Sequence, residues 1–367
     1  MNLPQIDCNQ QLFVDDIPLL DVRAPVEYQQ GSFPHAVNLP LINNDERQAI
    51  GIRYKHQGQA KAIELGQELI NGVVKDQRVA NWKSFVQNFP HGALYCFRGG
   101  MRSKISQQWL YEATGIKYPR INGGYKAMRK YLITELEKSV QLIMPLILSG
   151  RTGTGKTQFL HRLQQKLDLE NIYHHRGSAF GKHVNQQPSQ IDVENRLSIS
   201  LLKHRHNNNL QLVIEDESTA IGSRRLPDSF AKLMKTSPVI VLETPIETRL
   251  NIVFQEYVVN LLSEYQTAMD HDLGFNAWRT YVSSALEKIQ NRLGGSRYRD
   301  IKKQMDYAFN RQLQFHENEH HKPWIYQLLT EYYDPMYDFQ LNKKIDRIIY
   351  RGDESDILQC ITEKGIK

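Results

Sequence analysis

The alternation of short apolar runs with amphipathic stretches predicts two α/β units in succession. In the first, runs of strand length alternate with stretches of helical period, as in a sheet whose parallel strands are joined by helices. The predicted strands are residues 17–23, 36–39 and 93–95, and the predicted helices start at Pro25 and fall within 45–74, 103–113 and 124–139. We therefore expect a central parallel sheet in this part of the chain.

A second α/β unit is expected next, because a new apolar strand opens at residues 142–148. Two further strands are predicted at 211–215 and 238–243. Residues 246–333 have a helical period, so we expect a helical C-terminal extension on this unit. The predicted domains are residues 1–139 and 140–367.

Composition and charge narrow the class of protein but leave its partner open. Hydrophobic residues make up 40% of the chain and charged residues 23%, and no apolar run is long enough to span a bilayer. We expect a soluble protein without a membrane partner. The formal net charge of +6 suits an RNA partner and a mildly basic enzyme equally well.

The cysteines indicate a reducing compartment. Cys8, Cys96 and Cys360 are far apart and odd in number, which argues against a disulfide framework, and they lack the spacing of metal ligands. The N-terminal residues also lack the basic and apolar regions of a signal peptide. We therefore expect a cytoplasmic location.

A cysteine at the end of an apolar strand is the first candidate for chemistry. Residues 94–103 read Leu-Tyr-Cys-Phe-Arg-Gly-Gly-Met-Arg-Ser, which predicts a strand, a tight loop and the start of a helix. The backbone N–H groups of such a loop would surround Cys96, and Arg98 and Arg102 add positive charge, which favours a reactive thiolate. The alternative is a buried cysteine without chemistry.

A phosphate-binding loop is predicted directly after the strand at 142–148. The sequence there matches the P-loop pattern in its strand–loop–helix context, with residues Gly150, Arg151, Thr152, Gly153, Thr154, Gly155, Lys156 and Thr157. Backbone N–H groups would wrap the phosphate oxygens, Lys156 would neutralise charge, and Thr157 could reach a bound Mg²⁺. A di- or triphosphate ligand is expected here.

Two acidic residues follow the next predicted strand. Asp216 or Glu217 could hold a metal through water or activate a reacting group, as at a Walker B strand end. A solvated strand terminus is the alternative. We leave open whether any metal is bound.

Residues 292–303 are the candidate lid or RNA-contact segment. Gly294 and Gly295 would allow hinge movement, and the candidate contact residues are Arg292, Arg297, Tyr298 and Arg299. The arginines suit phosphate and the tyrosine could stack on a base. A solvated helix–loop junction is the alternative.

Three other segments allow two interpretations each. The loop at 174–181, expected after a strand, should lie on the phosphate side of the sheet, but its paired histidines lack further ligands for a metal. The apolar stripe at 252–262 indicates core more than an isoprenoid pocket. The aromatic turn at 332–338 could stack on a base or simply pack.

The first unit resembles a rhodanese-type domain. The resemblance rests on residues 21–23, 27–28, 31–40 and the Cys96 loop. It implies that this cysteine carries sulfur or selenium as a persulfide or perselenide. Common rhodanese loops place the arginine five residues after the cysteine, whereas Arg102 lies six residues after Cys96, the spacing of cysteine-dependent phosphatases. We expect the wider loop to accept a chalcogen-bearing phosphate.

The whole chain resembles the tRNA 2-selenouridine synthase family, in which a rhodanese-like α/β domain precedes a P-loop NTPase-like α/β domain. The resemblance includes both loops and residues 175–181, 293–298 and 333–338. It implies conversion of wobble 2-thiouridine in lysine, glutamate and glutamine tRNAs to 2-selenouridine. Geranyl diphosphate would first alkylate the sulfur, and selenophosphate would then supply selenium.

The resemblance also implies roles for the two loops. Cys96 would carry the selenium while Arg98 and Arg102 hold phosphate, and the P-loop would take the diphosphate. We expect no tightly bound cofactor, with Mg²⁺ left open, and a monomer. The alternatives are a P-loop small-molecule kinase with an appended sulfurtransferase domain, and a non-catalytic RNA-binding regulator that uses nucleotide as a switch.

Overall fold

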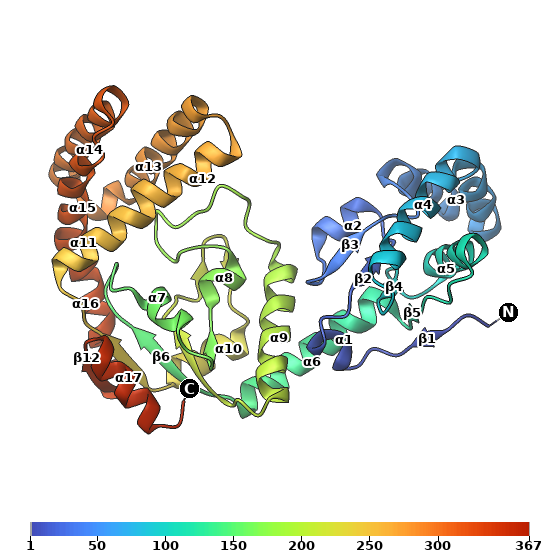
Figure 1. Ribbon diagram of the computed structural model, residues 1–367, viewed down its shortest axis with the longest axis horizontal. Helices are drawn as coiled ribbons and strands as arrows, with labels where there is room; N and C mark the ends of the chain where they lie inside the picture. The colour runs from blue at the N-terminus through green and yellow to red at the C-terminus, as the bar shows by residue number, and fades with distance from the viewer. Residues whose placement is uncertain (1, 367) are drawn as a thin grey trace. The chain divides into compact units, whose positions relative to one another are not determined.

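The computed structural model describes residues 2–366, which form two compact units (Figure 1). The first unit contains residues 1–141 together with 189–208, and the second contains 142–188 and 209–367. Each unit has a five-stranded sheet in which every neighbouring pair of strands is parallel. The predicted α/β class, with a parallel sheet in each part, is confirmed.

The sheet of the first unit has the strand order β1–β5–β4–β2–β3. Its strands are β1 (Gln5–Ile6), β5 (Arg120–Ile121), β4 (Ala93–Tyr95), β2 (Leu19–Asp21) and β3 (Ala36–Asn38). All residues of the central strands β4 and β2 are buried, as expected for parallel strands covered on both faces by helices. Strands β1 and β5 were not predicted, because each has only two residues.

Seven helices surround this sheet: α1 (Gln11–Val14), α2 (Pro25–Gln30), α3 (Asn44–Leu69), α4 (Gly72–Asn88), α5 (Met101–Thr114), α6 (Gly124–Leu142) and α9 (Gln190–His206). Helix α9 is far from the others in sequence but packs against α1, which assigns it to this unit. Helix α3 is kinked at Gly58, whose φ of 80° is left-handed.

The sheet of the second unit has the strand order β12–β11–β6–β8–β7. Its strands are β12 (Ile348–Gly352), β11 (Val239–Leu242), β6 (Met144–Ser149), β8 (Gln211–Glu215) and β7 (Lys166–Leu167). The predicted strand at 142–148 starts two residues later, because α6 continues to Leu142. Strand β12 was not predicted: it lies beyond the region 246–333 that was expected to be helical, and it pairs with β11.

The remaining elements of the second unit are mostly helical. Around the sheet lie α7 (Lys156–His161), α8 (Leu169–Tyr173), α10 (Asp228–Thr236), α17 (Glu354–Glu363), the short hairpin of β9 (Ala220–Ile221) and β10 (Arg224–Arg225), and the 3₁₀ turn η4 (Ile345–Arg347). Within residues 2–366, no helix combines the length and the apolar character that crossing a bilayer requires.

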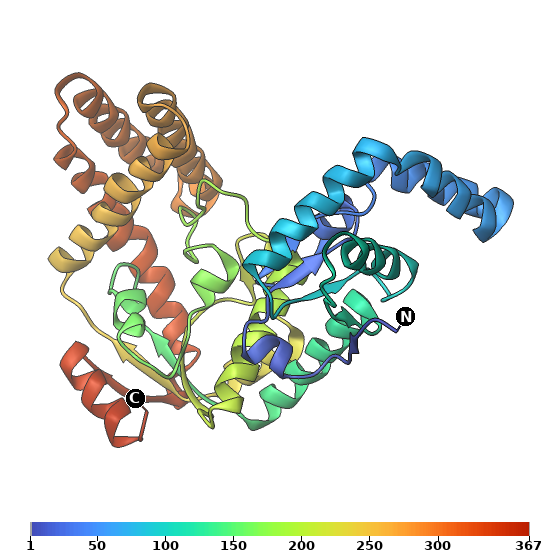
Figure 2. The same cartoon turned by 45° about the vertical axis from the view of Figure 1, so that its right-hand side comes forward.

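A separate group of helices occupies residues 246–342 (Figure 2). It comprises α11 (Ile246–Phe254), the π-helical η1 (Gln255–Asn260), α12 (Leu261–Ala268), α13 (His271–Leu293), α14 (Gly295–Phe315), the 3₁₀ turn η2 (Glu319–His321), α15 (Lys322–Leu328), the π-helical η3 (Leu329–Tyr333) and α16 (Asp334–Asn342). Helices α11 to α15, with η1 and η3, share one apolar core, which includes Trp278, Phe309 and Trp324. The prediction that 246–333 is helical is confirmed.

Candidate functional site

Cys96 lies directly after strand β4, buried at the base of its loop. Its Sγ is 3.1 Å from Oγ of Ser103, in the first turn of α5, so the thiol lies against the N-terminal end of that helix. The first N–H groups of a helix have no partner within the helix and favour negative charge. Gly100 at the N-cap has no side chain to cap them. The geometry is compatible with an anion beside Cys96, and the reactive role of this cysteine stays a prediction.

A glycine turn supports the Cys96 loop from below. The N–H of Tyr125 donates to the carbonyl oxygen of Cys96 at 2.9 Å. Gly124 has a φ of +56°, and a Cβ there would overlap that same carbonyl oxygen. Gly99 likewise has a φ of +63° and no room for a Cβ beside Gly123. Sequence reasoning missed this turn, although the adjacent pair Gly123 and Gly124 was a visible signal.

The two arginines of the loop have different surroundings. Arg102 forms a two-pronged ion pair with Glu27, with nitrogen–oxygen distances of 2.5 and 3.0 Å. Burial alone would raise the pKa of Glu27, but the hydrogen bonds and charge of Arg102 outweigh it, so the pKa lies below its usual value. Arg98 is exposed beside the ring of Phe97. The phosphate-holding role of both arginines stays a prediction.

The P-loop follows strand β6 and leads into helix α7, which begins at Lys156. Gly153 and Gly155 have left-handed φ values of 81° and 79°, and a Cβ on Gly150 would lie 2.7 Å from the carbonyl oxygen of Leu242. These positions therefore require glycine. The Lys156 ammonium lies over the loop and donates to the carbonyl oxygen of Gly150 at 2.7 Å. The loop therefore has a P-loop conformation, and its binding of phosphate stays a prediction.

A cavity of about 490 Å³ opens above the P-loop. Its lining residues come from the P-loop, helix α8 and the loop after it, the segment after β8, helices α11, η1 and α13, and the segment from η3 to Lys344. Its basic residues are Lys156, Arg176, Arg292 and Lys344, and its acidic residues are Glu170, Asp216, Glu217 and Glu256. The space and the charges suit a phosphorylated ligand with bound cations.

The two predicted acidic residues differ in their contacts. Asp216 accepts hydrogen bonds from Ser149 and, at 2.5 Å, from the ammonium of Lys344. Glu217 points into the cavity, where burial, reinforced by the charge of Glu215, raises its pKa to about 8. Glu217 is therefore the group that a cation or a proton from a ligand would reach.

Two further glutamates belong to this acidic group, and the sequence did not indicate them as such. Glu170 accepts a hydrogen bond from the Thr157 hydroxyl at 3.2 Å, and its own N–H donates to Glu215 at 3.2 Å. Burial raises the pKa of both carboxyls; the charge of Glu217 raises that of Glu170 further, and the charge of Glu170 raises that of Glu215. Among the described residues, no set of three or more histidine, cysteine or acidic side chains is arranged as a metal site. A Mg²⁺ here would need phosphate oxygens among its ligands.

Helix α16 is fastened to the P-loop. The Tyr337 hydroxyl accepts a hydrogen bond from the N–H of Gly150 at 3.0 Å, and the Asp338 carboxylate accepts three from the Arg151 guanidinium, at 2.8, 2.8 and 3.0 Å. The segment at 332–338, expected to be an aromatic turn, is therefore helical and contacts the phosphate-binding loop. Sequence reasoning missed Tyr337 and Lys344 as site residues.

The loop at 174–181 reaches the cavity as predicted. Arg176, Gly177, Ser178 and Ala179 line the cavity. The loop follows helix α8, however, so the prediction of a strand before it is wrong. The pKa of His175 is lowered to about 4, chiefly by burial, so this histidine is neutral.

The side chains of the predicted lid or RNA-contact residues do not form one cluster. Arg292 lines the cavity, Arg297 pairs with Glu331 at 3.1 Å, and Tyr298 packs against the helical core. Arg299 is exposed. Helix α13 ends and α14 begins around Gly294, whose φ is 86°, so the segment is a junction of two helices. Most of the stripe at 252–262 belongs to the apolar core of the helices, whereas Ile252 and Tyr257 also line the cavity.

The fold and the site define an α/β protein with two units. The first unit has a buried cysteine in a loop at a helix N-terminus, and the second is a P-loop domain with an additional group of helices. The model for the tRNA 2-selenouridine synthase AAA domain matches residues 143–366. The chain is 48% identical over 349 residues to the tRNA 2-selenouridine synthase of Marinobacter nauticus and 47% identical over 354 residues to that of Bordetella bronchiseptica. These alignments cover 95% and 96% of both chains, respectively.

The chain belongs to the tRNA 2-selenouridine synthase family. It is a transferase with that family's function, as the sequence predicted. The kinase and regulator alternatives are set aside. A solved N-terminal domain from Clostridium difficile 630 is 28% identical and covers 35% of this chain and 98% of that chain, with a TM-score of 0.31, too low to carry an argument about fold.

Proposed function

We propose that this enzyme converts wobble 2-thiouridine in lysine, glutamate and glutamine tRNAs to 2-selenouridine in two reactions, one at each loop. The observation that supports this proposal is the presence, on one chain, of a buried thiol at a helix N-terminus and a complete P-loop. Geranyl diphosphate first alkylates the sulfur. Selenophosphate then supplies selenium, and the geranylated sulfur leaves.

In the first reaction, the P-loop holds the diphosphate of geranyl diphosphate. The sulfur of 2-thiouridine forms a bond to C1 of the geranyl group as the bond from C1 to the diphosphate oxygen breaks. Lys156, Arg176 and the loop N–H groups stabilise the charge that develops on the departing diphosphate. A Mg²⁺ bound to the phosphates near Thr157 and Glu217 would neutralise further charge.

The alkylation also has a chemical reason. A thione sulfur leaves C2 of a pyrimidine poorly, whereas an alkylated sulfur can leave as a thiol. The proton on N3 is lost when the sulfur is alkylated, and the departing diphosphate or water accepts it. The first reaction therefore prepares the base for the second.

In the second reaction, the selenium of selenophosphate forms a bond to C2 of the base as the bond from C2 to the geranylated sulfur breaks and geranyl thiol leaves. Water then cleaves the Se–P bond and phosphate departs. The Cys96 loop is the site of this exchange. The N-terminal end of α5 beside Cys96 offers unpaired N–H groups that would attract the anionic selenophosphate. Arg98 and Arg102 hold the phosphate portion of selenophosphate. We also propose that the enzyme is a cytoplasmic monomer with no tightly bound cofactor.

Mass spectrometry of wobble nucleosides tests this proposal. The purified protein is incubated with 2-thiouridine-containing tRNA, geranyl diphosphate and selenophosphate, and each is omitted in turn. We expect geranylated 2-thiouridine without selenophosphate and 2-selenouridine when both co-substrates are present. Selenouridine formed without geranyl diphosphate would contradict the order of steps, and unchanged 2-thiouridine under every condition would contradict the proposal as a whole.

A further inference from the structure

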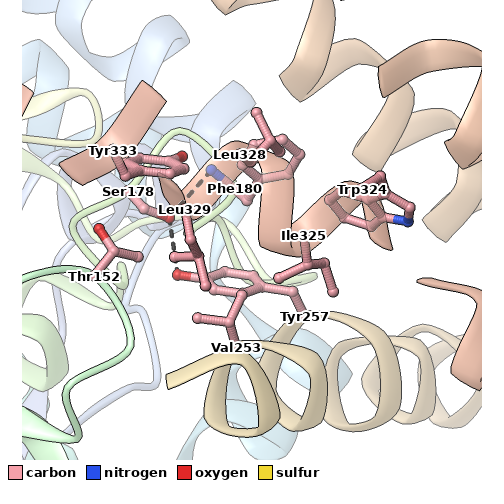
Figure 3. A pocket seen from close by; sticks show the side chains of 10 residues that line it. All are labelled: Thr152, Ser178, Phe180, Val253, Tyr257, Trp324, Ile325, Leu328, Leu329 and Tyr333. Carbon is pink, nitrogen blue, oxygen red and sulfur yellow. Dashed lines mark hydrogen bonds between the residues drawn. The ribbon is translucent and has the colours of Figure 1, made fainter. Parts of the chain in front are cut away.

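A narrow apolar crevice lies beside the P-loop in the second unit (Figure 3). It runs from Thr152 and Tyr333 at one end to Trp324 at the other. Its lining residues are Thr152, Ser178, Phe180, Val253, Tyr257, Trp324, Ile325, Leu328, Leu329 and Tyr333. Four of these residues, Thr152, Ser178, Tyr257 and Tyr333, also line the phosphate cavity. The crevice is therefore continuous with the site of the phosphates.

The crevice lacks the groups that would recognise a nucleotide base. The only side-chain oxygens on its walls lie at the end that it shares with the phosphate cavity. Two of them, on Ser178 and Tyr257, are hydrogen-bonded to each other at 2.8 Å. The far end is formed by Phe180, Trp324 and Leu328, which offer hydrocarbon and aromatic surface. Such walls suit an apolar tail.

Both π-helical segments of the described chain contribute to the crevice. Segment η1 supplies Tyr257, and η3 supplies Leu329 and Tyr333. A π-helix is rare and energetically less favourable than an α-helix, and such segments frequently occur at functional sites. Two of them on the walls of one crevice indicate that its shape is used for binding.

The Tyr333 hydroxyl marks the end of the crevice next to the phosphates. Tyr333 is 7% exposed, and no described residue gives its hydroxyl a hydrogen-bond partner. A buried hydroxyl without a partner costs free energy that a ligand oxygen would recover. Burial also raises the pKa of Tyr333, so the hydroxyl keeps its proton and can donate it to an anion.

We propose that this crevice binds the hydrocarbon tail of a prenyl diphosphate whose phosphates lie on the P-loop, with the Tyr333 hydroxyl donating to an oxygen of the phosphate nearest the tail. This inference rests on the proposed function, which places geranyl diphosphate at the P-loop. It adds the site of the tail and the residues that select its length.

The size of the crevice sets a condition on binding. Its volume is about 20 Å³, and one water-sized sphere needs roughly 10–15 Å³. A ten-carbon tail therefore enters only when side chains on the walls, such as Leu329 and Ile325, move aside. Binding should then be sensitive to added bulk at the crevice and insensitive to the same bulk elsewhere in the helical core.

Leu328 and Leu286 provide a matched pair for this test. Both are leucines of the same helical core, with exposures of 3% and 1%, but only Leu328 lines the crevice. Replacement of either by phenylalanine adds similar bulk to a packed core. The full-length variants L328F and L286F are compared with the unsubstituted protein by calorimetric titration with geranyl diphosphate and with inorganic diphosphate.

We expect L328F to weaken geranyl diphosphate binding about tenfold, while the Kd of inorganic diphosphate stays within about twofold, because the change affects the tail and not the phosphates. The shorter five-carbon dimethylallyl diphosphate should be affected less than geranyl diphosphate. L286F should bind both ligands normally. Equal geranyl diphosphate binding by L328F and L286F would overturn the inference.

Trp324 gives an independent readout. Its fluorescence should change on addition of geranyl diphosphate but not of inorganic diphosphate, and W324F should lose that change.

The tRNA assay distinguishes failure of the crevice assignment from failure of the proposed function. If the unsubstituted protein geranylates tRNA and L328F does so with an unchanged KM for geranyl diphosphate, the crevice assignment fails and the proposed function stands. If the unsubstituted protein makes no geranylated tRNA, both fail.

Discussion

The hydroxyl of Tyr337 on α16 accepts a hydrogen bond from the N–H of Gly150, the first residue of the P-loop, at 3.0 Å. The same hydroxyl lies 3.1 Å from Oγ of Ser149. A side chain 187 positions away thus uses an N–H at the start of the phosphate-binding loop. Phosphate binding and the position of α16 are therefore physically coupled.

The substitution Tyr337→Phe tests this coupling. Loss of the hydroxyl leaves the Gly150 N–H without its partner, which should lower the free energy of unfolding by about 1–3 kcal/mol. Inorganic diphosphate should then raise the Tm of the variant more than that of the unsubstituted protein, because a phosphate oxygen can take the vacated position. Thermal unfolding with and without diphosphate measures both effects. Y326F, at a residue that is 47% exposed, is the control.

The substitution Cys96→Ala should separate the two reactions. We expect geranylated tRNA to form at a normal rate, while selenium incorporation falls by about a hundredfold or more, because the thiol at the site of selenium transfer is missing. The measurement is the nucleoside assay with both co-substrates. C360S is the control, since Cys360 is half-buried in the second unit. Equal loss of both reactions in C96A would refute the division of labour between the loops.

The substitution Lys156→Ala should affect the other reaction. Removal of one charge that stabilises a developing anion typically costs on the order of 10²–10³ in rate, and we expect that loss for geranyl transfer. The rate is followed with 2-thiouridine-containing tRNA in the absence of selenophosphate. K235A changes an exposed lysine on α10 and should be neutral. A normal geranylation rate in K156A would contradict the proposal that the P-loop holds the diphosphate.

The cavity carboxyls predict a pH dependence of stability. The folded state raises the pKa of Glu217 from 4.5 to about 8, so it binds a proton that the unfolded chain has lost. This contribution to the free energy of unfolding is present below about pH 4.5 and disappears as the pH rises through about 8. Stability of the second unit should therefore fall between these pH values.

Glu217→Gln tests the sign of this effect. The amide carries no charge, so the variant should be more stable than the unsubstituted protein at pH 8.5 by about 1–3 kcal/mol and should lose part of the pH dependence. Urea unfolding at pH 6 and pH 8.5 gives the comparison. E287Q, at an exposed position of α13, should keep the original slope. An unchanged slope in E217Q would show that this carboxyl titrates normally.

The exposed Arg299 is the clearest remaining RNA-contact candidate. If it contacts a tRNA phosphate, Arg299→Ala should weaken tRNA binding and reduce the slope of log K against log salt concentration by about 1. Filter binding at several salt concentrations measures both quantities. K232A, at an exposed lysine on α10, should leave the slope unchanged. An identical slope for R299A would exclude a phosphate contact at this position.

Sequence reasoning identified the elements that carry continuous apolar runs. Strands β2, β4, β6, β8 and β11 were predicted because nearly every residue in them is buried. Strand β12 was missed, since it is half-exposed at the edge of the sheet and has no continuous buried run. A strand of that kind is defined by its pairing with β11, which local sequence does not specify.

The residues of the candidate sites likewise include some that the sequence identified and others that it did not. The Cys96 loop and the P-loop are contiguous motifs, so the sequence alone was enough to name their residues. Glu27, which neutralises Arg102 from 75 positions away, has no local pattern that connects it with the loop. Lys344, 128 positions from Asp216, is a second example. Contacts of this length depend on chain topology, which the motifs alone do not give.

The distribution of the two units along the chain has a consequence for how the protein folds during synthesis. The first unit needs α9, so its fold is incomplete until residue 206 has left the ribosome. The second needs β12, so the edge of β11 stays unpaired until residue 352 has emerged. Domains usually fold as units during translation. In this protein each unit is completed only by a later segment of the chain. A fragment that ends at residue 139 lacks α9 and should therefore be unstable.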